Sequence, residues 1–141
     1  MIQSIKGIPL HPFDKLSMLF TTNFMPTFIL YTSVPDIDEE IETTLHHEVC
    51  EIISNVIGKS KDFIMTIFHA GVSIRFGQTD QFAAYCELKN VGTLSSKVTD
   101  ELSRLLCSLL TTKLDVNPKT IYIEFQESER HLWGWNSSTF A

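Results

Sequence analysis

The chain has 141 residues, of which 43% are hydrophobic and 20% charged, so its length and composition suit one globular domain with one core. Its net charge of −6 and the scatter of its 11 Lys and Arg residues argue against a surface for nucleic acid or an anionic membrane. No apolar run approaches the roughly 18 residues of a membrane span, and the N-terminus lacks the apolar core of a secretory signal. We therefore expect a protein made in the cytosol, with any export occurring without a leader.

The N-terminal residues show no sustained hydrophobic period and contain Pro9 and Pro12, which interrupt a helix. We interpret residues 1–25 as an N-terminal extension and residues 26–141 as the organised domain. Residues 27–34 are rich in β-branched and aromatic side chains and predict a strand. The unbroken apolar run inside that strand favours a central position in a sheet.

A helix is predicted over residues 37–57, because apolar side chains recur there every three or four positions. Asp36 is the expected N-cap, and Gly58 is the expected C-terminal stop. His46 and His47 fall on the polar side of this helix, where we expect them to be solvated. Neither they nor the other histidines show a metal-ligand spacing, so no metal or cofactor is implied.

Residues 63–68 predict a second strand, Gly71 a turn, and residues 72–76 a shorter extended piece. The second half then repeats the layout of the first, beginning with a predicted strand over residues 82–89. A leucine-rich helix capped by Ser95 or Ser96 and a last strand over 120–125 complete the pattern.

Two β-α-β units side by side give an α/β (α+β) fold, in which one mixed four-stranded sheet carries both helices on one face. No third helix is predicted to cover the opposite face, which suggests burial in an oligomer. Cys50, Cys86 and Cys107 form no Cys-x-x-Cys pair and are odd in number, so no disulfide framework is expected. We interpret them as reduced, mostly buried thiols.

Three stretches carry a resemblance to a known family: residues 25–30 (MPTFIL), Gly58-Lys59 with the strand that follows, and the C-terminal residues 134–141 (GWNSSTFA). In this order they resemble the macrophage migration inhibitory factor family of the tautomerase superfamily, over residues 26–141. The resemblance implies a homotrimer with active sites between subunits and an N-terminal proline exposed after removal of methionine. It also implies keto–enol tautomerase (isomerase) activity on substrates such as phenylpyruvate or dopachrome.

The family's catalytic base matches Pro26, whose nitrogen is a secondary amine when it is the first atom of the chain. An α-amino group titrates at about 7.7–8.0, and apolar surroundings or a nearby cation such as Lys59 lower that pKa. The resemblance implies that Lys59 binds the substrate's carboxylate or carbonyl oxygen and that the main chain of Val91 contacts the substrate. It also implies that Tyr122 of a neighbouring subunit contributes its hydroxyl to the site. The expected pocket walls are Phe63, Trp133, Trp135 and Phe140.

Taken without the family, several of these residues have ordinary interpretations. Lys59 is a typical cation at a helix C-terminus, Tyr122 a typical packed tyrosine, and the two tryptophans can plug a subunit interface. One departure is also notable. Glu124 stands where mammalian members have an asparagine, and its carboxylate could repel an anionic substrate or pair with Lys59.

The extension decides whether this chemistry is available. With residues 1–25 attached, the nitrogen of Pro26 is a tertiary amide and has no basic lone pair. Translation starting at Met25, removal of the extension, and its retention all remain open. Retention would leave a non-catalytic protein, and the family's second role, as a secreted cytokine-like ligand of cell-surface receptors, is then the alternative function.

Overall fold

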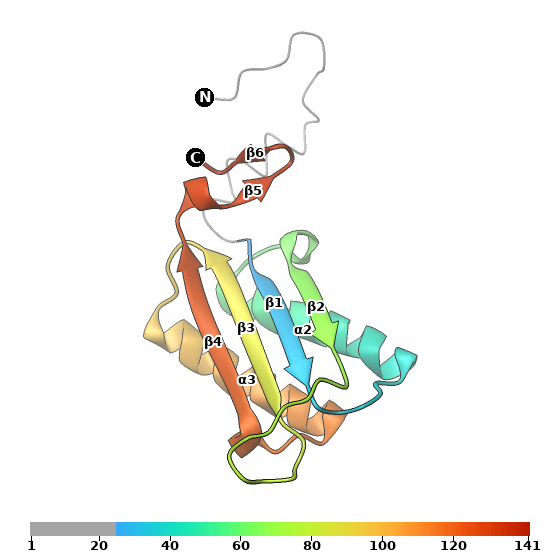
Figure 1. The fold of residues 1–141 in the computed structure, drawn as a ribbon. Coiled ribbons are helices and arrows are strands. Elements are labelled where there is room, and N and C mark those ends of the chain that lie inside the picture. The colour runs from blue at the N-terminus through green and yellow to red at the C-terminus, as the bar shows by residue number, and fades with distance from the viewer. Residues whose placement is uncertain (1–24) are drawn as a thin grey trace.

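The computed structural model describes residues 25–141, so the predicted extension, apart from Met25, lies outside the described residues. One sheet has the strand order β2-β1-β3-β4, and two long helices cover one of its faces (Figure 1). The strands are β1 (Thr27–Thr32), β2 (Met65–His69), β3 (Ala84–Val91) and β4 (Ile121–Ser128), and the helices are α2 (Glu39–Ile57) and α3 (Ser96–Leu114). The predicted fold class is confirmed.

Each β-α-β unit supplies one parallel strand pair, and the two units meet along an antiparallel pair. β1 runs parallel to β2, and β3 runs parallel to β4. β1 pairs with β3 in the antiparallel sense, with Thr27 opposite Lys89 and Thr32 opposite Ala84. The apolar run in β1 therefore lies in one of the two central strands, as its composition predicted.

The core lies between the sheet and the two helices. In β1 and β3 every second side chain is buried, which is the period of a strand with one covered face. In α3 the buried positions recur every fourth residue, which is one stripe of a helix. The largest fully buried side chains include Phe28, Leu30 and Leu88 from the sheet, Leu45 and Ile53 from α2, and Leu102, Leu106 and Leu110 from α3.

The opposite face of the sheet has no helix over it, and we call it the open face (Figure 1). A row of rings crosses it: Tyr31 stacks on His69 at a centroid distance of 4.9 Å and on Tyr85 at 6.2 Å. Tyr85 is in register with Tyr122, whose side chain is 63% exposed. Met65 is 60% exposed. Large apolar and aromatic groups in one contiguous row are typical of a surface that another chain covers.

The first helix begins at Glu39, two residues later than predicted, because Asp38 and not Asp36 is its N-cap. The Asp38 carboxylate accepts the backbone N–H of Glu40 at 3.0 Å, and its carbonyl accepts that of Glu42 at 2.8 Å. Gly58 ends the helix as predicted, in the left-handed conformation with φ of 78°.

We expect Asp38→Ala to lower the free energy of unfolding by about 1 kcal/mol, because an orphan N–H of the first turn loses its acceptor. The matched control is Asp36→Ala, an exposed carboxylate outside the helix, for which we expect a change within about 0.5 kcal/mol. Urea unfolding followed by circular dichroism measures both. Equal losses in the two variants would contradict the assignment of the cap.

One strand prediction needs correction. Phe63 lies outside β2, because Lys61–Phe63 form a short 3-10 helix that Ser60 caps. Residues 72–76, expected to be extended, pair with no strand of the sheet. Just before them, the N–H groups of Gly71 and Val72 donate to the carbonyls of Val34 and Thr32.

The interpretation of His46 as solvated is also wrong. Its ring stacks on Phe68 with centroids 3.8 Å apart, and its Nδ1 lies within hydrogen-bond distance of the Thr66 hydroxyl. The helix packs close enough to β2 that this position is half-buried. The three cysteines are free; Cys86 is buried, and burial raises the pKa of its thiol, while Cys50 and Cys107 are half-buried.

Beyond β4 the chain forms a small C-terminal segment. A short 3-10 helix (Arg130–Leu132) leads to a two-stranded hairpin of β5 (Gly134–Trp135) and β6 (Ser138–Thr139). Its turn residues Asn136 and Ser137 have φ of 50° and 66°, as a tight hairpin turn requires. The hairpin lies beyond the end of the sheet where β1 begins (Figure 1).

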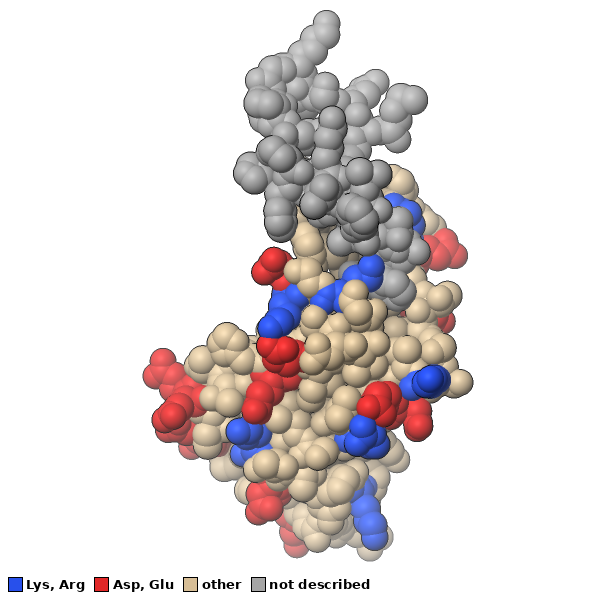
Figure 2. Space-filling view, turned by 180° about the vertical axis from the view of Figure 1, so that it is seen from behind, with Lys and Arg blue, Asp and Glu red and all other residues tan. Residues whose placement is uncertain are grey.

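The helix-covered face carries both acidic and basic side chains, spread over its surface (Figure 2). Mixed charge of this kind is typical of a solvated face. Within residues 25–141, no helix combines the length and the apolar character needed to cross a membrane.

Candidate active site

Pro26 immediately precedes β1 and is buried, as is Met25, which is 8% exposed. The carbonyl of Pro26 accepts the backbone N–H of Met65 at 3.1 Å, which ties it to the first residue of β2. Pro26 therefore lies at one end of a central strand, held by a neighbouring strand. Because β1 and β2 are parallel and β3 is antiparallel to them, the start of β2 and the end of β3 lie at this same end of the sheet.

Lys59 reaches this end of the sheet because α2 stops there. The backbone N–H groups of Gly58 and Lys59 both donate to the carbonyl of Ser54, at 2.8 and 3.1 Å. The Ser54 hydroxyl in turn donates to the carbonyl of Lys59. These bonds fix the backbone of Lys59 to the last turn of the helix, just before the chain enters the 3-10 helix and β2.

Three of the four predicted wall residues come together in an aromatic cluster. Trp135 meets Phe63 edge to face at a centroid distance of 5.8 Å and stacks on Phe140 at 6.0 Å. The backbone N–H of Phe140 donates to the carbonyl of Trp133 at 3.3 Å, and the Nε of Arg130 donates to the carbonyl of Phe140 at 2.8 Å. Phe63, between α2 and β2, thus joins the C-terminal hairpin to the end of the sheet that carries Pro26.

Val91 is the last residue of β3 and is buried at the same end. The next residue, Gly92, has φ of 104° and donates its N–H to the carbonyl of Ser128 at 3.1 Å. This bond fixes the main chain beside Val91, which is the part of the residue expected to contact a substrate.

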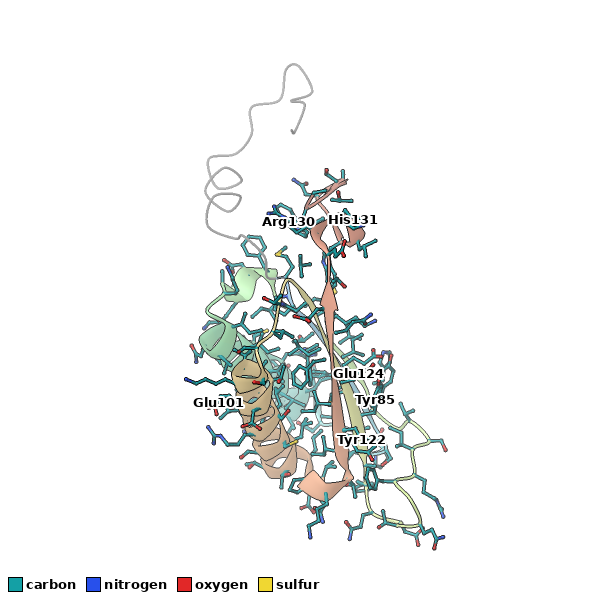
Figure 3. The ribbon with its side chains drawn as sticks, turned by 90° about the vertical axis from the view of Figure 1, so that its left-hand side faces the viewer. Tyr85, Glu101, Tyr122, Glu124, Arg130 and His131 are labelled. Carbon is teal, nitrogen blue, oxygen red and sulfur yellow. The ribbon has the colours of Figure 1, made fainter. Side chains whose placement is uncertain are left out.

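Tyr122 lies at the opposite end of the sheet, near the start of β4, and contacts Phe76 with centroids 4.9 Å apart. Figure 3 shows it far along β4 from Arg130 and His131 of the C-terminal segment. One chain therefore does not bring Tyr122 to Pro26. The other predicted residues, by contrast, lie on elements that meet at one end of the sheet.

Glu124 is on the open face, where the Tyr85 hydroxyl donates a hydrogen bond to it (Figure 3). The hydrogen bond to Glu124 raises the pKa of Tyr85 to about 12, and the nearby carboxylate of Glu87 adds to this. Ionising the phenol would place a third negative charge beside two carboxylates. Sequence reasoning missed Tyr85 as the partner of Glu124, because that pairing depends on the register between β3 and β4.

Asn90 is a further residue that sequence reasoning passed over. It lies in β3 next to Val91 and is fully buried, yet neither atom of its carboxamide has a hydrogen-bond partner. The available sequence signal was a polar amide at an alternate position of the strand whose preceding members, Cys86 and Leu88, are apolar. Among the described residues, no cluster of three His, Cys, Asp or Glu side chains has the arrangement of a metal site.

Comparison with known proteins identifies relatives over almost the whole described chain. A family model described as "Macrophage migration inhibitory factor (MIF)" matches residues 25–141. The macrophage migration inhibitory factor of Meriones unguiculatus is 30% identical over 117 residues, which is 83% of this chain and all of that protein.

Solved structures agree with the sequence relatives. The homologue of macrophage migration inhibitory factor from Prochlorococcus marinus has a TM-score of 0.76 at 30% identity, over 82% of this chain and 99% of its own. The similar protein from Entamoeba histolytica has a TM-score of 0.72 at 31% identity, with the same coverage. The chain belongs to the macrophage migration inhibitory factor family, within the tautomerase superfamily.

Proposed function

We propose that this protein is a keto–enol tautomerase of aromatic α-keto acids such as phenylpyruvate, or of dopachrome-like rings, with Pro26 as its base. The observation that carries this is the convergence of Pro26, Lys59 and the aromatic cluster of Phe63, Trp135 and Phe140 at one end of the sheet. A planar aromatic substrate fits between rings, and its carboxylate fits an ammonium group.

The reaction needs only a proton carrier and charge compensation. The neutral amine of Pro26 takes the proton from the carbon α to the keto group, and the C–H electron pair becomes the double bond of the enolate. The ammonium of Lys59 stabilises the negative oxygen or the adjacent carboxylate. The proton then returns from the Pro26 ammonium to the oxygen, which gives the enol and restores the base.

Pro26 is suited to this task if its nitrogen is free. The position is buried, and an apolar environment disfavours the ammonium form, so the pKa of the amine falls below the ordinary 7.7–8.0 or so of a chain terminus. The amine is then largely neutral at physiological pH. The proposal therefore requires the absence of residues 1–25, whose last member, Met25, fills buried space beside Pro26.

We further propose that the active form is a homotrimer. The aromatic row on the open face and the exposed Met65 and Tyr122 supply the surface for such contacts. A neighbouring subunit would also supply the Tyr122 hydroxyl that a single chain keeps at the far end of the sheet. The small C-terminal hairpin, which is marginal by itself, would gain a packing partner.

The test of the base is a Pro26→Gly variant in a chain that begins at residue 26. We expect kcat/KM for phenylpyruvate to fall about tenfold or more, because a flexible primary amine replaces a rigid secondary one. Size-exclusion chromatography with light scattering is the control and should give the same trimer mass for both proteins. Unchanged activity in the variant would refute the amine mechanism.

The chain with residues 1–25 attached favours a second function, because the Pro26 nitrogen in it is an amide buried with Met25. In that form the protein would be a non-catalytic, cytokine-like ligand of a cell-surface receptor. Receptor binding that persists in the Pro26→Gly variant would show that the two functions are separable.

A further inference from the structure

The side chain of Asn90 poses a problem of hydrogen bonding. It is 0% exposed, and both its oxygen and its nitrogen lack a partner in the structure. By contrast, buried Thr32, on the neighbouring strand, donates its hydroxyl to the carbonyl of Ala83 at 2.9 Å. Buried polar groups are nearly always paired, and the exceptions point to a partner that is missing.

The strand register places Asn90 opposite Pro26. Thr27 pairs with Lys89, so the next position of the antiparallel ladder joins Pro26 and Asn90. Facing residues of an antiparallel ladder alternate between hydrogen-bonded and non-hydrogen-bonded pairs. The N–H of Ser33 donates to the carbonyl of Ala83, so odd-numbered residues of β1 form the hydrogen-bonded pairs. Pro26 and Asn90 therefore form a non-hydrogen-bonded pair, in which the facing side chains lie closest together.

Both residues direct their side chains toward the helices. Alternation along β3 puts Asn90 on the buried face with Cys86 and Leu88, and alternation along β1 puts the ring of Pro26 on the same face as Phe28. The orphan carboxamide thus lies beside the proline that carries the proposed function.

The missing partner follows from the chemistry of the proline nitrogen. Joined to Met25, that nitrogen is a tertiary amide with no proton to donate. As the first atom of the chain it is a secondary amine with one N–H, or an ammonium with two. We propose that Asn90 is a positioning residue, whose side-chain oxygen accepts a hydrogen bond from the Pro26 amine when Pro26 is the first residue. This inference rests on the proposed function and deepens it.

Such a bond would hold the amine in one orientation and leave its lone pair directed toward the substrate. It would also favour the protonated form, since the ammonium is the stronger donor. The charged groups around this end of the sheet stay the same in every variant below. They include Lys59 and Asp62 after α2, Lys89 on β3, Lys97 on α3, Glu127 on β4, and Glu129, Arg130 and His131 in the C-terminal segment.

The experiment uses chains that begin at Pro26, labelled with ¹⁵N-proline, and follows the Pro26 resonance against pH. We expect Asn90→Leu to lower the midpoint by about 0.5 unit or more, and Asn90→Asp to raise it by about 1 unit. The acid limb of the pH profile of kcat/KM should shift in the same directions, to lower pH in Asn90→Leu and to higher pH in Asn90→Asp. The matched control, Thr32→Val, removes another buried polar group at the far end of β1 and should leave the midpoint unchanged.

The thermal unfolding temperature, Tm, is a second measurement that tests the proposal even if a variant is less stable. With residues 1–25 attached, Asn90→Leu removes an orphan amide and should raise Tm. In the chain that begins at Pro26, the same substitution removes a hydrogen-bonded amide, so it should raise Tm by a smaller amount or lower Tm. The role of Asn90 would be overturned by one result: the same Pro26 titration midpoint in the parent, Asn90→Leu and Asn90→Asp proteins, together with equal Tm shifts for Asn90→Leu in both chain lengths.

The outcomes separate the two proposals. If the midpoints follow the expected order but the protein turns over no keto acid, the role of Asn90 stands and the proposed function fails. If turnover depends on Pro26 but ignores position 90, only the role of Asn90 fails.

Discussion

A chain that begins at Pro26 is expected to exceed the chain that begins at Met1 by about 1,000-fold in kcat/KM for phenylpyruvate tautomerisation. The reason is the state of one nitrogen. In the longer chain it is an amide whose lone pair is delocalised into the carbonyl, so it cannot accept a proton. In the shorter chain it is an amine that can accept a proton, and we expect the buried position to favour its neutral form.

The measurement is the change in ultraviolet absorbance as the enol forms, on two proteins whose termini are verified by mass spectrometry. Acetylation of the Pro26 amine in the shorter chain is the matched control, since it restores an amide without adding residues 1–25. It should lower the rate to that of the longer chain. A full rate from a chain whose intact mass includes Met1 would contradict the mechanism.

Hydrophobic period predicted both long helices, because burial of one face against the core dictates it, and β-branched and aromatic composition predicted the four strands of the sheet. The ends were less predictable. Asp36 and Asp38 are both good N-caps by residue type, and only the path of the chain out of β1 decides that Asp38 takes the role. Residues 72–76 have strand-like composition, but they pair with no strand of the sheet.

Contacts between elements could not be predicted from composition. His46 lies on the polar side of an isolated helix, yet the ring of Phe68 on β2 comes within stacking distance of it. The Tyr85–Glu124 bond depends on the register of β3 against β4, and a shift of one residue between these strands would put the two side chains on opposite faces of the sheet. Neither contact has a signature within a short stretch of sequence.

The candidate site was predictable to a different extent. Resemblance named Pro26, Lys59 and the aromatic walls. The fold brings the elements that carry Pro26, Lys59 and Phe63 to one end of the sheet, because α2 and β3 end where β1 and β2 begin. The resemblance also implied a partner's Tyr122, which agrees with the distance of that residue along β4 from the rest of the site. Asn90 was missed, because its significance lies in being buried without a partner, which only three-dimensional structure reveals.

Lys59→Met, in a chain that begins at Pro26, is expected to lower kcat/KM for phenylpyruvate roughly 10- to 150-fold, the equivalent of a charged hydrogen bond of about 1.5–3 kcal/mol. The variant keeps a side chain of similar length but removes its charge. A cation lowers the pKa of a nearby amine, so its loss should raise that of Pro26 and move the acid limb of the profile to higher pH.

The matched control for this change is Lys61→Met. Lys61 lies two residues further along the chain, where its ammonium pairs with Glu51 on the surface, so its removal alters the net charge equally but not the proposed site. We expect kcat/KM and the acid limb to stay within about twofold and 0.2 unit of the parent, since exposed ion pairs contribute little. Lys59→Arg should retain most of the activity, because it keeps the charge. If Lys59→Met and Lys61→Met behaved alike, the ammonium of Lys59 would have no part in binding the substrate.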